Sequence, residues 1–442
     1  MKALVIGSGG REHAILWALK RTSNVTLDLY CAPGNGGISE LAHCVPIPVT
    51  DQSSLINFAR SNAIDITIVG PEGPLAEGIV DRLEGSGLKI VGPSAVASRL
   101  ESSKGFAKDF MHRHQIPTAD YFIARSGAEA LESLRSGRFG AADAAVVVKA
   151  DGLAAGKGVI VAPSRLAAEK AVAELTGGAL VSPDAVTRIL IEEALQGREV
   201  SVLLFSDGRD YALMPPARDH KRVGENDTGP NTGGMGAITD ASVVDNQLLD
   251  RIVREVVEPT LKGAALEGFP FRGILFVGLM MTAEGPKVLE YNVRFGDPET
   301  QAILMRLESD VFQVFQSLVN GDLRNTEVKW SGQSSACVVL ASEGYPGAYQ
   351  TGLPISGLER VDNTRADLQV FHAGTAKPEG GGFVTSGGRV LGVAAAGTTL
   401  KDCLENCYAA IKPIAWEGMQ YRRDIGQFNE PGKEALLKSR AR

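Results

Sequence analysis

Short apolar segments that end in glycine or a turn alternate with helical patterns through the first hundred residues. The apolar segments are 3–7, 25–32, 65–70 and 88–92. The stretches between them carry apolar side chains at spacings of three and four, which is typical of amphipathic helices. This alternation predicts a parallel βαβ sheet, with a ligand site at the carboxyl ends of its strands.

The middle of the chain shows a different strand pattern. Apolar runs at 144–150 and 158–162 flank a glycine loop, and those at 188–195 and 199–208 flank a tight turn. Each pair predicts an antiparallel hairpin, and a third hairpin is predicted over 273–293. The second half of the chain therefore departs from a doubly wound parallel sheet.

Helices and one long loop complete the predicted organisation. Lys104 lies near the middle of a helical stretch at 92–114, and a long helix is predicted at about 241–266. The glycine-rich segment 218–237 predicts a functional loop, because structureless segments of that length are unusual inside a compact domain. Another helix is expected to open near residue 297, and short strands and turns follow from about 330.

Composition excludes several classes of protein. With 442 residues, 44% hydrophobic and 22% charged, the chain is long enough for roughly three ordered domains. A net charge of −7 argues against a surface that binds nucleic acid. No stretch reaches the ~18 apolar residues of a membrane span, so we predict a soluble cytoplasmic protein. The five cysteines lack the spacing of a disulfide framework or a zinc site.

The first strand ends in the glycine-rich turn GSGGREH at 7–13. Glu12 stands where the dinucleotide-binding fingerprint has its third glycine, which weakens that interpretation. A glycine turn before a helix still presents N–H groups to an anion, and Arg11 adds positive charge, so the turn predicts a phosphate monoester site. The glycine turns at 33–37 and 70–74 should border the same site.

The glycine loop after Lys149 resembles a phosphate cradle but is not a P-loop. Only three residues separate Gly152 from Gly156, and Gly158 replaces the hydroxyl residue that a P-loop has after its lysine, here Lys157. Because the loop joins two strands, we predict a lid that closes over phosphates.

A pair of oxygen ligands marks a later strand. Glu290 and Asn292 occupy alternate positions and therefore share one face, which suits a Mg²⁺ ion bridging phosphates. An exposed polar face of an edge strand is the alternative interpretation. Arg294 follows on the same face and would neutralise a phosphoryl group during transfer. Asp297, before Pro298, fits either a helix N-cap or a substrate contact.

Motifs spread over nearly the whole chain carry a family resemblance: GSGGREHA, APGNGG, VGPEGPL, KADGLAAGKGV, DHKRVGENDTGPNTGGMGA, RFGDPETQ, SEGYPGAY, VLGVAAAG and YRRDIG. Together they resemble the phosphoribosylamine-glycine ligases, or glycinamide ribonucleotide synthetases, of the ATP-grasp superfamily. The resemblance implies an α/β fold that is α+β in part. The expected parts are an amino-terminal βαβ substrate domain (1–102), an ATP-grasp domain (103–329) with a lid (123–192), a carboxyl-terminal mixed domain (330–427) and a tail (428–442).

The resemblance also implies roles for individual residues. ATP would be held by Lys104, Lys149, Gly152, Gly156, Lys157, Gly158, Glu192, Glu193, Leu195 and Glu199, and Mg²⁺ or Mn²⁺ by Glu290 and Asn292. The substrates would contact Gly9, Gly10, Arg11, Asn35, Glu72, Asp219, Lys221, Arg294 and Asp297, with Arg294, Asp297 and Lys149 in catalysis. Many ATP-grasp members carry a further acid on the preceding strand, which this chain lacks at 273–281.

The family joins glycine to 5-phosphoribosylamine with ATP, through a glycyl phosphate, in the second step of purine synthesis. We accordingly expect no nucleophilic serine or cysteine, and a monomer. Three alternatives stay open: another ATP-grasp carboxylate-amine ligase, a non-catalytic nucleotide-binding module, and an NAD-dependent oxidoreductase. Asp28 on the second strand motivates the last, since a ribose-binding acid would lie near there.

Overall fold

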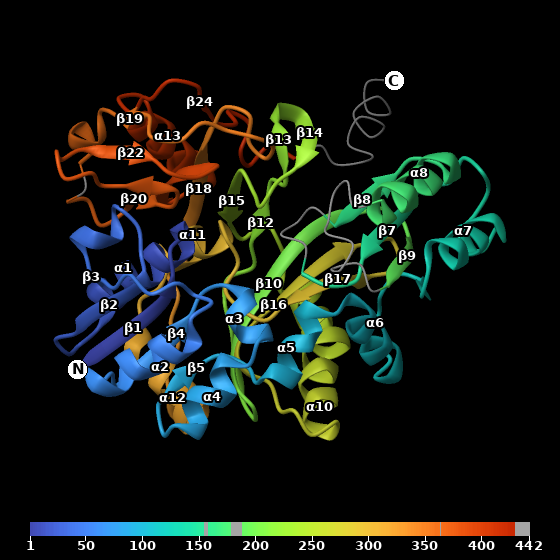
Figure 1. Ribbon diagram of the computed structural model, residues 1–442, viewed down its shortest axis with the longest axis horizontal. Helices are drawn as coiled ribbons and strands as arrows, with labels where there is room; N and C mark the ends of the chain where they lie inside the picture. Colours follow the sequence, from blue (N-terminus) through green and yellow to red (C-terminus); the bar gives the residue numbers. More distant parts are fainter. Residues whose placement is uncertain (154–157, 178–187, 363, 429–442) are drawn as a thin grey trace.

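The computed structural model describes residues 1–153, 158–177, 188–362 and 364–428. The amino-terminal and carboxyl-terminal parts lie together at one end, and helices α7 (Gly127–Arg135) and α8 (Arg165–Thr176) project at the other (Figure 1). No helix in the described ranges is long and apolar enough to cross a membrane. Gly156, Lys157 and nearly all of the predicted tail lie outside the described residues.

The first hundred residues form the predicted parallel sheet, with strand order β3-β2-β1-β4-β5. All its strand pairs are parallel, so the glycine turns that follow β1, β2 and β4 meet at one edge. The elements are β1 (Lys2–Gly7), α1 (Gly10–Thr22), β2 (Asp28–Pro33), β3 (His43–Cys44), α2 (Gln52–Ser61), β4 (Ile66–Val69), α3 (Glu72–Ala76), α4 (Ile79–Gly85) and β5 (Ile90–Val91).

Two antiparallel sheets make up the middle of the chain. The lid sheet has the order β6-β9-β7-β8 and the central sheet β11-β10-β16-β17. The predicted hairpins β7–β8 and β16–β17 are confirmed. The strands are β6 (Tyr121–Ala124), β7 (Val146–Ala150), β8 (Val159–Ala162), β9 (Ile189–Glu193), β10 (Arg198–Asp207), β11 (Tyr211–Leu213), β16 (Arg272–Met281) and β17 (Pro286–Asn292).

The predicted hairpin over 188–208 is wrong. Strand β9 pairs with β6 and β7 in the lid sheet, whereas β10 pairs with β11 and β16 in the central sheet. The residues between them cross from one sheet to the other. The crossing packs closely on β16 at Gly197, because a Cβ added there would lie 2.0 Å from the Met281 carbonyl oxygen. The sequence pattern marks strands, but it does not identify the partner that each strand meets in space.

The glycine-rich segment 218–237 is not the structureless loop that was predicted. It contains β12 (Arg218–Asp219), the hairpin β13 (Arg222–Gly224) and β14 (Thr228–Asn231), and the start of β15 (Gly236–Thr239). Strands β12 and β15 extend the carboxyl-terminal sheet, whose order is β12-β15-β18-β23-β20 with β24 beside β18. Its other strands are β18 (Ser334–Ser342), β20 (Leu368–His372), β23 (Arg389–Gly397) and β24 (Met419–Gln420), packed on α13 (Leu400–Ile411).

The helices differ from the prediction mainly at their ends. The predicted helix 92–114 is two helices, α5 (Ala95–Ser102) and α6 (Lys104–Arg113), and the Ser103 side chain caps the second by accepting the Phe106 N–H. Lys104 is therefore the first residue of a helix and not its middle. The remaining helices are α9 (Asn246–Ile252), continued through a π-helical turn into α10 (Glu258–Leu266), and α11 (Glu299–Leu304) and α12 (Val311–Asn320).

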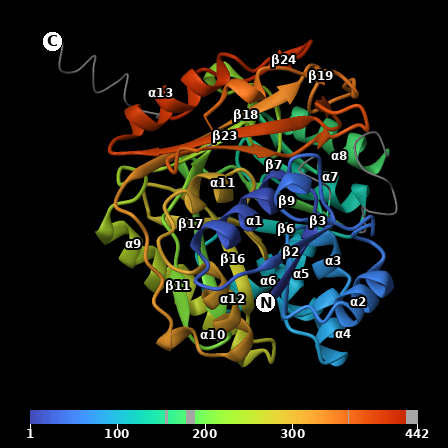
Figure 2. The ribbon, with the colours of Figure 1, turned by 90° about the vertical axis from the view of Figure 1, so that its left-hand side faces the viewer.

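Packing separates the lid from the rest. The lid sheet has a core of its own that includes Val148, Leu175 and Ile191. The amino-terminal, central and carboxyl-terminal sheets share their cores, as in the cluster of Val5, Phe205 and Ala394. Helices α1 and α11 lie side by side beneath the carboxyl-terminal sheet (Figure 2). Three sheets thus form one base, against which the lid projects.

Candidate active site

Four cationic side chains from different elements act on the carboxylate of Glu290. They are Lys221, Lys149, Lys104 and Arg294. Surrounding protein raises the pKa of Glu290, but these cations outweigh that effect and hold the pKa below its usual value. The carboxylate is nevertheless open to solvent. Positive charge from the lid, the central sheet and the 218–237 segment therefore converges around one accessible acid.

Glu290 and Asn292 lie on one face of β17. They flank Tyr291, which is buried on the other face with its hydroxyl 2.7 Å from that of Thr260. A register shift precedes the pair, after which Glu290 lies opposite Gly278. No side chain on β16 therefore crowds the carboxylate from that position.

The side-chain oxygens of Glu290 and Asn292 fit a divalent cation whose other ligands come from phosphate and water. In the described part of the chain, no cluster of three or more His, Cys, Asp or Glu side chains has a metal-binding arrangement. Mg²⁺ is commonly held by one or two protein oxygens together with substrate phosphates, so Glu290 and Asn292 suffice for that mode. The carboxylate of Glu199 on β10 lies close enough to repel that of Glu290, although the family resemblance implies that Glu199 contacts the nucleotide.

Arg294 lies between Asn292 and two carboxylates. Its guanidinium donates to Asn292 Oδ1 at 3.0 Å and forms ion pairs with Glu101 at 2.9 Å and Glu72 at 3.3 Å. Burial raises the pKa of Glu101, whereas the charges of Arg294 and Arg11 outweigh burial at Glu72 and lower its pKa. The predicted alignment of Arg294 with Asn292 is present, and the two glutamates fix its direction.

Helix α6 and the lid sheet together form a buried lysine–glutamate–lysine cluster. Lys149 and Lys108 place their amines 2.9 and 3.0 Å from the same oxygen of Glu192, while the other oxygen of Glu192 has no hydrogen-bond partner. Lys108 is 2% exposed, and burial lowers its pKa to about 8, against the opposing charge of Glu192. Glu192 thus orients Lys149 with one carboxylate oxygen, and its other oxygen is available to accept a hydrogen bond.

Lys104 lies near Lys149, at the start of the glycine loop. Its amine donates to the Gly152 carbonyl at 2.7 Å, and the Ala150 N–H donates to the Gly158 carbonyl at 2.8 Å. Burial lowers the pKa of Lys104, opposed by the charge of Glu290. Glu193 ends β9 with an exposed side chain.

Lys221 is surrounded by acids. Its amine lies 3.2 Å from Asp219 and 3.8 Å from Glu199, and Glu290 and Glu299 act on it from further away. Burial lowers the pKa of Lys221, but the four acids raise it well above its usual value. Glu299, 4% exposed, has its pKa raised to about 7 by burial and by the charge of Asp219.

The segment that carries Asp219 and Lys221 is anchored by the end of the described chain. His220 is buried between them, stacks on Phe428 with ring centroids 4.1 Å apart, and accepts the Gly426 N–H at 2.9 Å. His220 is therefore a packing residue that holds its two neighbours in place.

The amino-terminal glycine turn is occupied by its own glutamate. Glu12 accepts the Gly9 N–H at 2.5 Å and forms an ion pair with Arg11 at 2.6 Å. A Cβ on Gly70 would lie 1.8 Å from a carboxylate oxygen of Glu12, so the neighbouring strand end is shaped around this side chain. The turn is a weaker anion site than its glycines predicted, because Glu12 already takes up two of its donors.

Asn35 is likewise engaged within the protein. Its amide donates to the carbonyls of Ser8 and His372, each at 2.8 Å, and its oxygen accepts the Ile38 N–H at 2.9 Å. Asn35 thus ties the glycine turn to the carboxyl-terminal sheet. Any contact with a sugar phosphate would have to compete with these bonds.

Asp297 does not cap the following helix. Its carboxylate accepts from Gln301 at 2.7 Å and lies 3.3 Å from Arg389, while Pro298 occupies the N-cap position without a side-chain bond. Burial raises the pKa of Asp297, but Arg389 and Arg11 outweigh it and lower the pKa. The alternative of a simple helix cap is therefore wrong.

Four important side chains were missed from the sequence. Lys108 stands four residues after Lys104, a helical spacing that shares a face, so it was available to pattern analysis. Glu299 lies inside the RFGDPE motif, where the sequence pattern predicts only the start of a helix. Glu101 and Arg389 carried no local signal, because their partners at 294 and 297 are remote in sequence.

The structure also removes the support for a dinucleotide enzyme. Asp28 begins β2 and pairs with Lys2, at the opposite end of the sheet from Gly7 and Pro33. A ribose-binding acid must lie at the carboxyl end of its strand, beside the glycine turn. Asp28 is at the wrong end.

Three family models match the chain in order. They are Phosphoribosylglycinamide synthetase N domain at residues 1–101, ATP-grasp (A) domain at 102–300, and C domain at 335–428. The chain belongs to the phosphoribosylglycinamide synthetase family. The predictions of family, ATP-grasp fold and ATP-dependent ligase class are confirmed.

Named relatives of the phosphoribosylglycinamide synthetase family support this over nearly full length. A phosphoribosylamine--glycine ligase of Rhizobium meliloti (strain 1021) is 45% identical over 426 residues, which cover 96% of this chain and 98% of the relative. That of Vibrio cholerae is 47% identical over 429 residues, with 96% and 98% covered. The crystal structure of the Thermotoga maritima enzyme matches with a TM-score of 0.81 at 32% identity, over 96% of this chain and 100% of that one.

More distant structures share the fold alone. Biotin carboxylase from Campylobacter jejuni is 14% identical, with a TM-score of 0.71 over 98% of each chain. This likeness confirms the ATP-grasp architecture of the synthetase and carries no information on its substrates.

Glu299 generates a prediction on stability. Its pKa of about 7 in the folded protein is above the usual value, so the unfolded state releases the proton first as pH rises. Wild-type protein should lose stability relative to Glu299→Gln between about pH 4.5 and 7, and the difference should level off above pH 7. Melting temperatures measured across this range would check it. The exposed Glu359→Gln is the control, and a difference for Glu299→Gln that stays flat with pH would contradict the assignment.

Proposed function

We propose that this synthetase joins glycine to 5-phosphoribosylamine with ATP, the glycine ligation step of purine biosynthesis, at the site between lid and base. The observation that carries the proposal is the Glu290–Asn292 pair, which faces the converging amines of Lys104 and Lys149 within a chain of this family. Two oxygen ligands beside phosphate-binding cations form the arrangement that phosphoryl transfer from a nucleotide requires.

The reaction proceeds in two displacements. A carboxylate oxygen of glycine attacks the γ-phosphorus of ATP, the bond to the β-phosphate oxygen breaks, and ADP leaves. The amine nitrogen of phosphoribosylamine then attacks the carbonyl carbon of glycyl phosphate, phosphate departs with the bonding electrons, and the nitrogen loses a proton. Side chains supply positioning and charge, and no serine or cysteine nucleophile is needed.

We propose the ATP contacts that the family resemblance implies, which come from the lid sheet and from elements beside it. Lys104 and Lys149 would hold the phosphates, with Gly152 and Gly158 at the base of the glycine loop. Glu192, Glu193 and Leu195 stand at the crossing between the two sheets, where adenosine would lie, and Glu199 begins the next strand. Glu290 and Asn292 would hold Mg²⁺ or Mn²⁺, which when bound offsets the negative charge of the phosphates.

The proposed substrate contacts lie on the base. Asp219, Lys221, Arg294 and Asp297 would surround glycine, and Arg294 would neutralise the phosphoryl group in transfer. Gly9, Gly10, Arg11, Asn35 and Glu72 border the position proposed for phosphoribosylamine. We further propose that the protein acts as a cytoplasmic monomer.

The deciding experiment is an assay of phosphate release from ATP with each substrate present alone and with both together. We expect release that needs glycine and phosphoribosylamine together. Release that is equal or greater with formate or bicarbonate in place of glycine would instead favour another carboxylate-amine ligase and refute the proposal.

Arg294 yields a prediction on turnover. Arg294→Lys keeps a charge near Glu72 and Glu101 but cannot reach Asn292 and both acids at once, so kcat should fall on the order of 10–100-fold. An alanine variant is less informative, because it would leave two enclosed carboxylates without their cation. Steady-state phosphate release measures the effect. The control is Arg272→Lys, whose arginine pairs with Glu84 on the surface. Near-normal turnover of Arg294→Lys would remove Arg294 from the mechanism.

Glu290 yields a prediction on metal dependence. Glu290→Gln retains an oxygen but loses the charge, so the Mg²⁺ concentration for half-maximal activity should rise on the order of tenfold. Titrating Mg²⁺ at saturating ATP measures this. Glu284→Gln, an exposed change in the turn of the same hairpin, is the matched control. An unchanged Mg²⁺ requirement would count against Glu290 as a ligand.

A further inference from the structure

The carboxyl-terminal domain reaches the site through one arginine. Arg389 is the first residue of β23, and its guanidinium donates to the Asp297 carbonyl at 2.8 Å while lying 3.3 Å from the Asp297 carboxylate. The same guanidinium donates to the carbonyls of Gly233 and Gly234. One side chain therefore joins two segments that are more than sixty positions apart in the chain.

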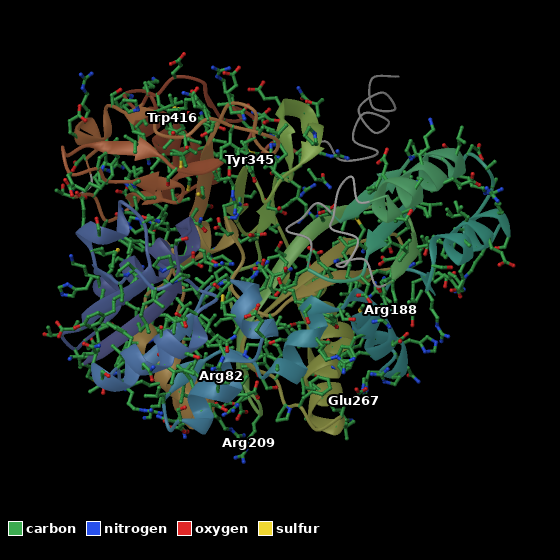
Figure 3. All side chains as sticks on the ribbon, in the orientation of Figure 1. Arg82, Arg188, Arg209, Glu267, Tyr345 and Trp416 are labelled. Atoms are coloured by element: carbon green, nitrogen blue, oxygen red, sulfur yellow. The ribbon has the colours of Figure 1, made fainter. Side chains whose placement is uncertain are left out.

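These two segments are also packed tightly against each other. A Cβ on Gly234 would lie 2.4 Å from Pro298 Cδ, so the glycine turn fits directly on the Asp297–Pro298 peptide. Tyr345, also from the carboxyl-terminal domain, accepts the Gly233 N–H at 3.0 Å through its hydroxyl. Figure 3 shows Tyr345 at the border between this domain and the β13–β15 region. The carboxyl-terminal domain thus holds the turn from two sides.

The charges around Asp297 come from three elements. Arg389 approaches from β23, Arg11 from α1 and Arg294 from the segment after β17, while Gln301 on α11 donates without charge. The charge of Asp297 also reaches the buried Cys337 thiol on β18 and helps to raise its pKa, after the larger effect of burial. Arg389 is the largest charge that opposes the effect of burial on Asp297. Arg389 therefore fixes both the position and the ionisation of the Asp297 side chain. That side chain lies beside the amino-terminal glycine turn, since a Cβ added to Gly9 would lie 3.4 Å from Asp297 Oδ2.

We propose that Arg389 is a positioning residue for the ligase reaction, acting through Asp297 and the Gly233–Gly234 turn. This inference rests on the proposed function, since Asp297 is placed among the substrate contacts there. It assigns to the carboxyl-terminal domain a part in the chemistry that the strands and turns of its sequence did not indicate. In the part of the chain that the structure describes, the Arg389 guanidinium forms no hydrogen bond or ion pair with the proposed ATP residues Lys104, Lys149 and Glu192, so its effect should be confined to the substrate side.

The test compares Arg389→Gln and Arg389→Lys with wild-type full-length protein. Arg389→Gln should lower kcat at least about tenfold while the Kd for ATP, measured by calorimetry with Mg²⁺, changes less than about threefold. The acid limb of the pH profile of kcat/KM should move to higher pH, because Asp297 loses the cation that most strongly lowers its pKa. Arg389→Lys keeps the charge, so it should leave the acid limb in place and recover part of kcat. Arg365→Gln is the control, since Arg365 is an exposed arginine of the same domain paired with Asp367.

Three outcomes would overturn the inference. They are turnover of Arg389→Gln within twofold of wild type, a fall in kcat with no movement of the acid limb, and parallel losses of ATP affinity and turnover. If Arg389→Gln does not fold, Arg389→Lys decides: reduced kcat with retained ATP affinity supports the role, and wild-type kcat refutes it. Failure of the proposed function is distinguishable, because wild-type protein would then show no release dependent on both substrates.

Discussion

The alternation of cations and carboxylates is the physical constraint on which the site depends. Lysines and arginines needed for a polyphosphate repel one another, and a buried amine is costly unless an acid lies beside it. Glu192 stands between Lys108 and Lys149, and Glu290 lies among four cations, in a protein whose net charge is −7. Each cation is therefore held in a fixed direction before any substrate arrives, which is the basis of electrostatic preorganisation.

The site lies where the lid sheet meets the base. The chain crosses from β9 to β10 beside Gly197, so the lid and the base are joined directly at the position proposed for adenosine. The lid has a hydrophobic core of its own, whereas the three base sheets share theirs. A lid with a separate core can shift without exposing the core of the base, which suits the proposed closure over an acyl phosphate.

The carboxyl-terminal sheet is part of the base and not an appendage. It takes in β12 and β15 from the middle of the chain, and β12 carries Asp219. Phe428 stacks on His220, so the end of the described chain supports the residues on either side of that histidine. The residues proposed to contact the substrates consequently come from all three base sheets, and their geometry depends on the shared packing of those sheets.

The sequence alone determined the parallel amino-terminal sheet, two of the hairpins and the Glu290–Asn292 pair, since hydrophobic periodicity and strand alternation are local properties. Its motifs also determined the family. Tertiary structure alone decided that β9 and β10 separate, that Glu12 fills the glycine turn and that Asp297 binds Arg389 instead of capping a helix. Those outcomes depend on partners distant in the chain, brought together by burial of apolar surface and by the need to pair buried charge. No local pattern records them, because the same short segment would be compatible with either arrangement until its neighbours in space are fixed.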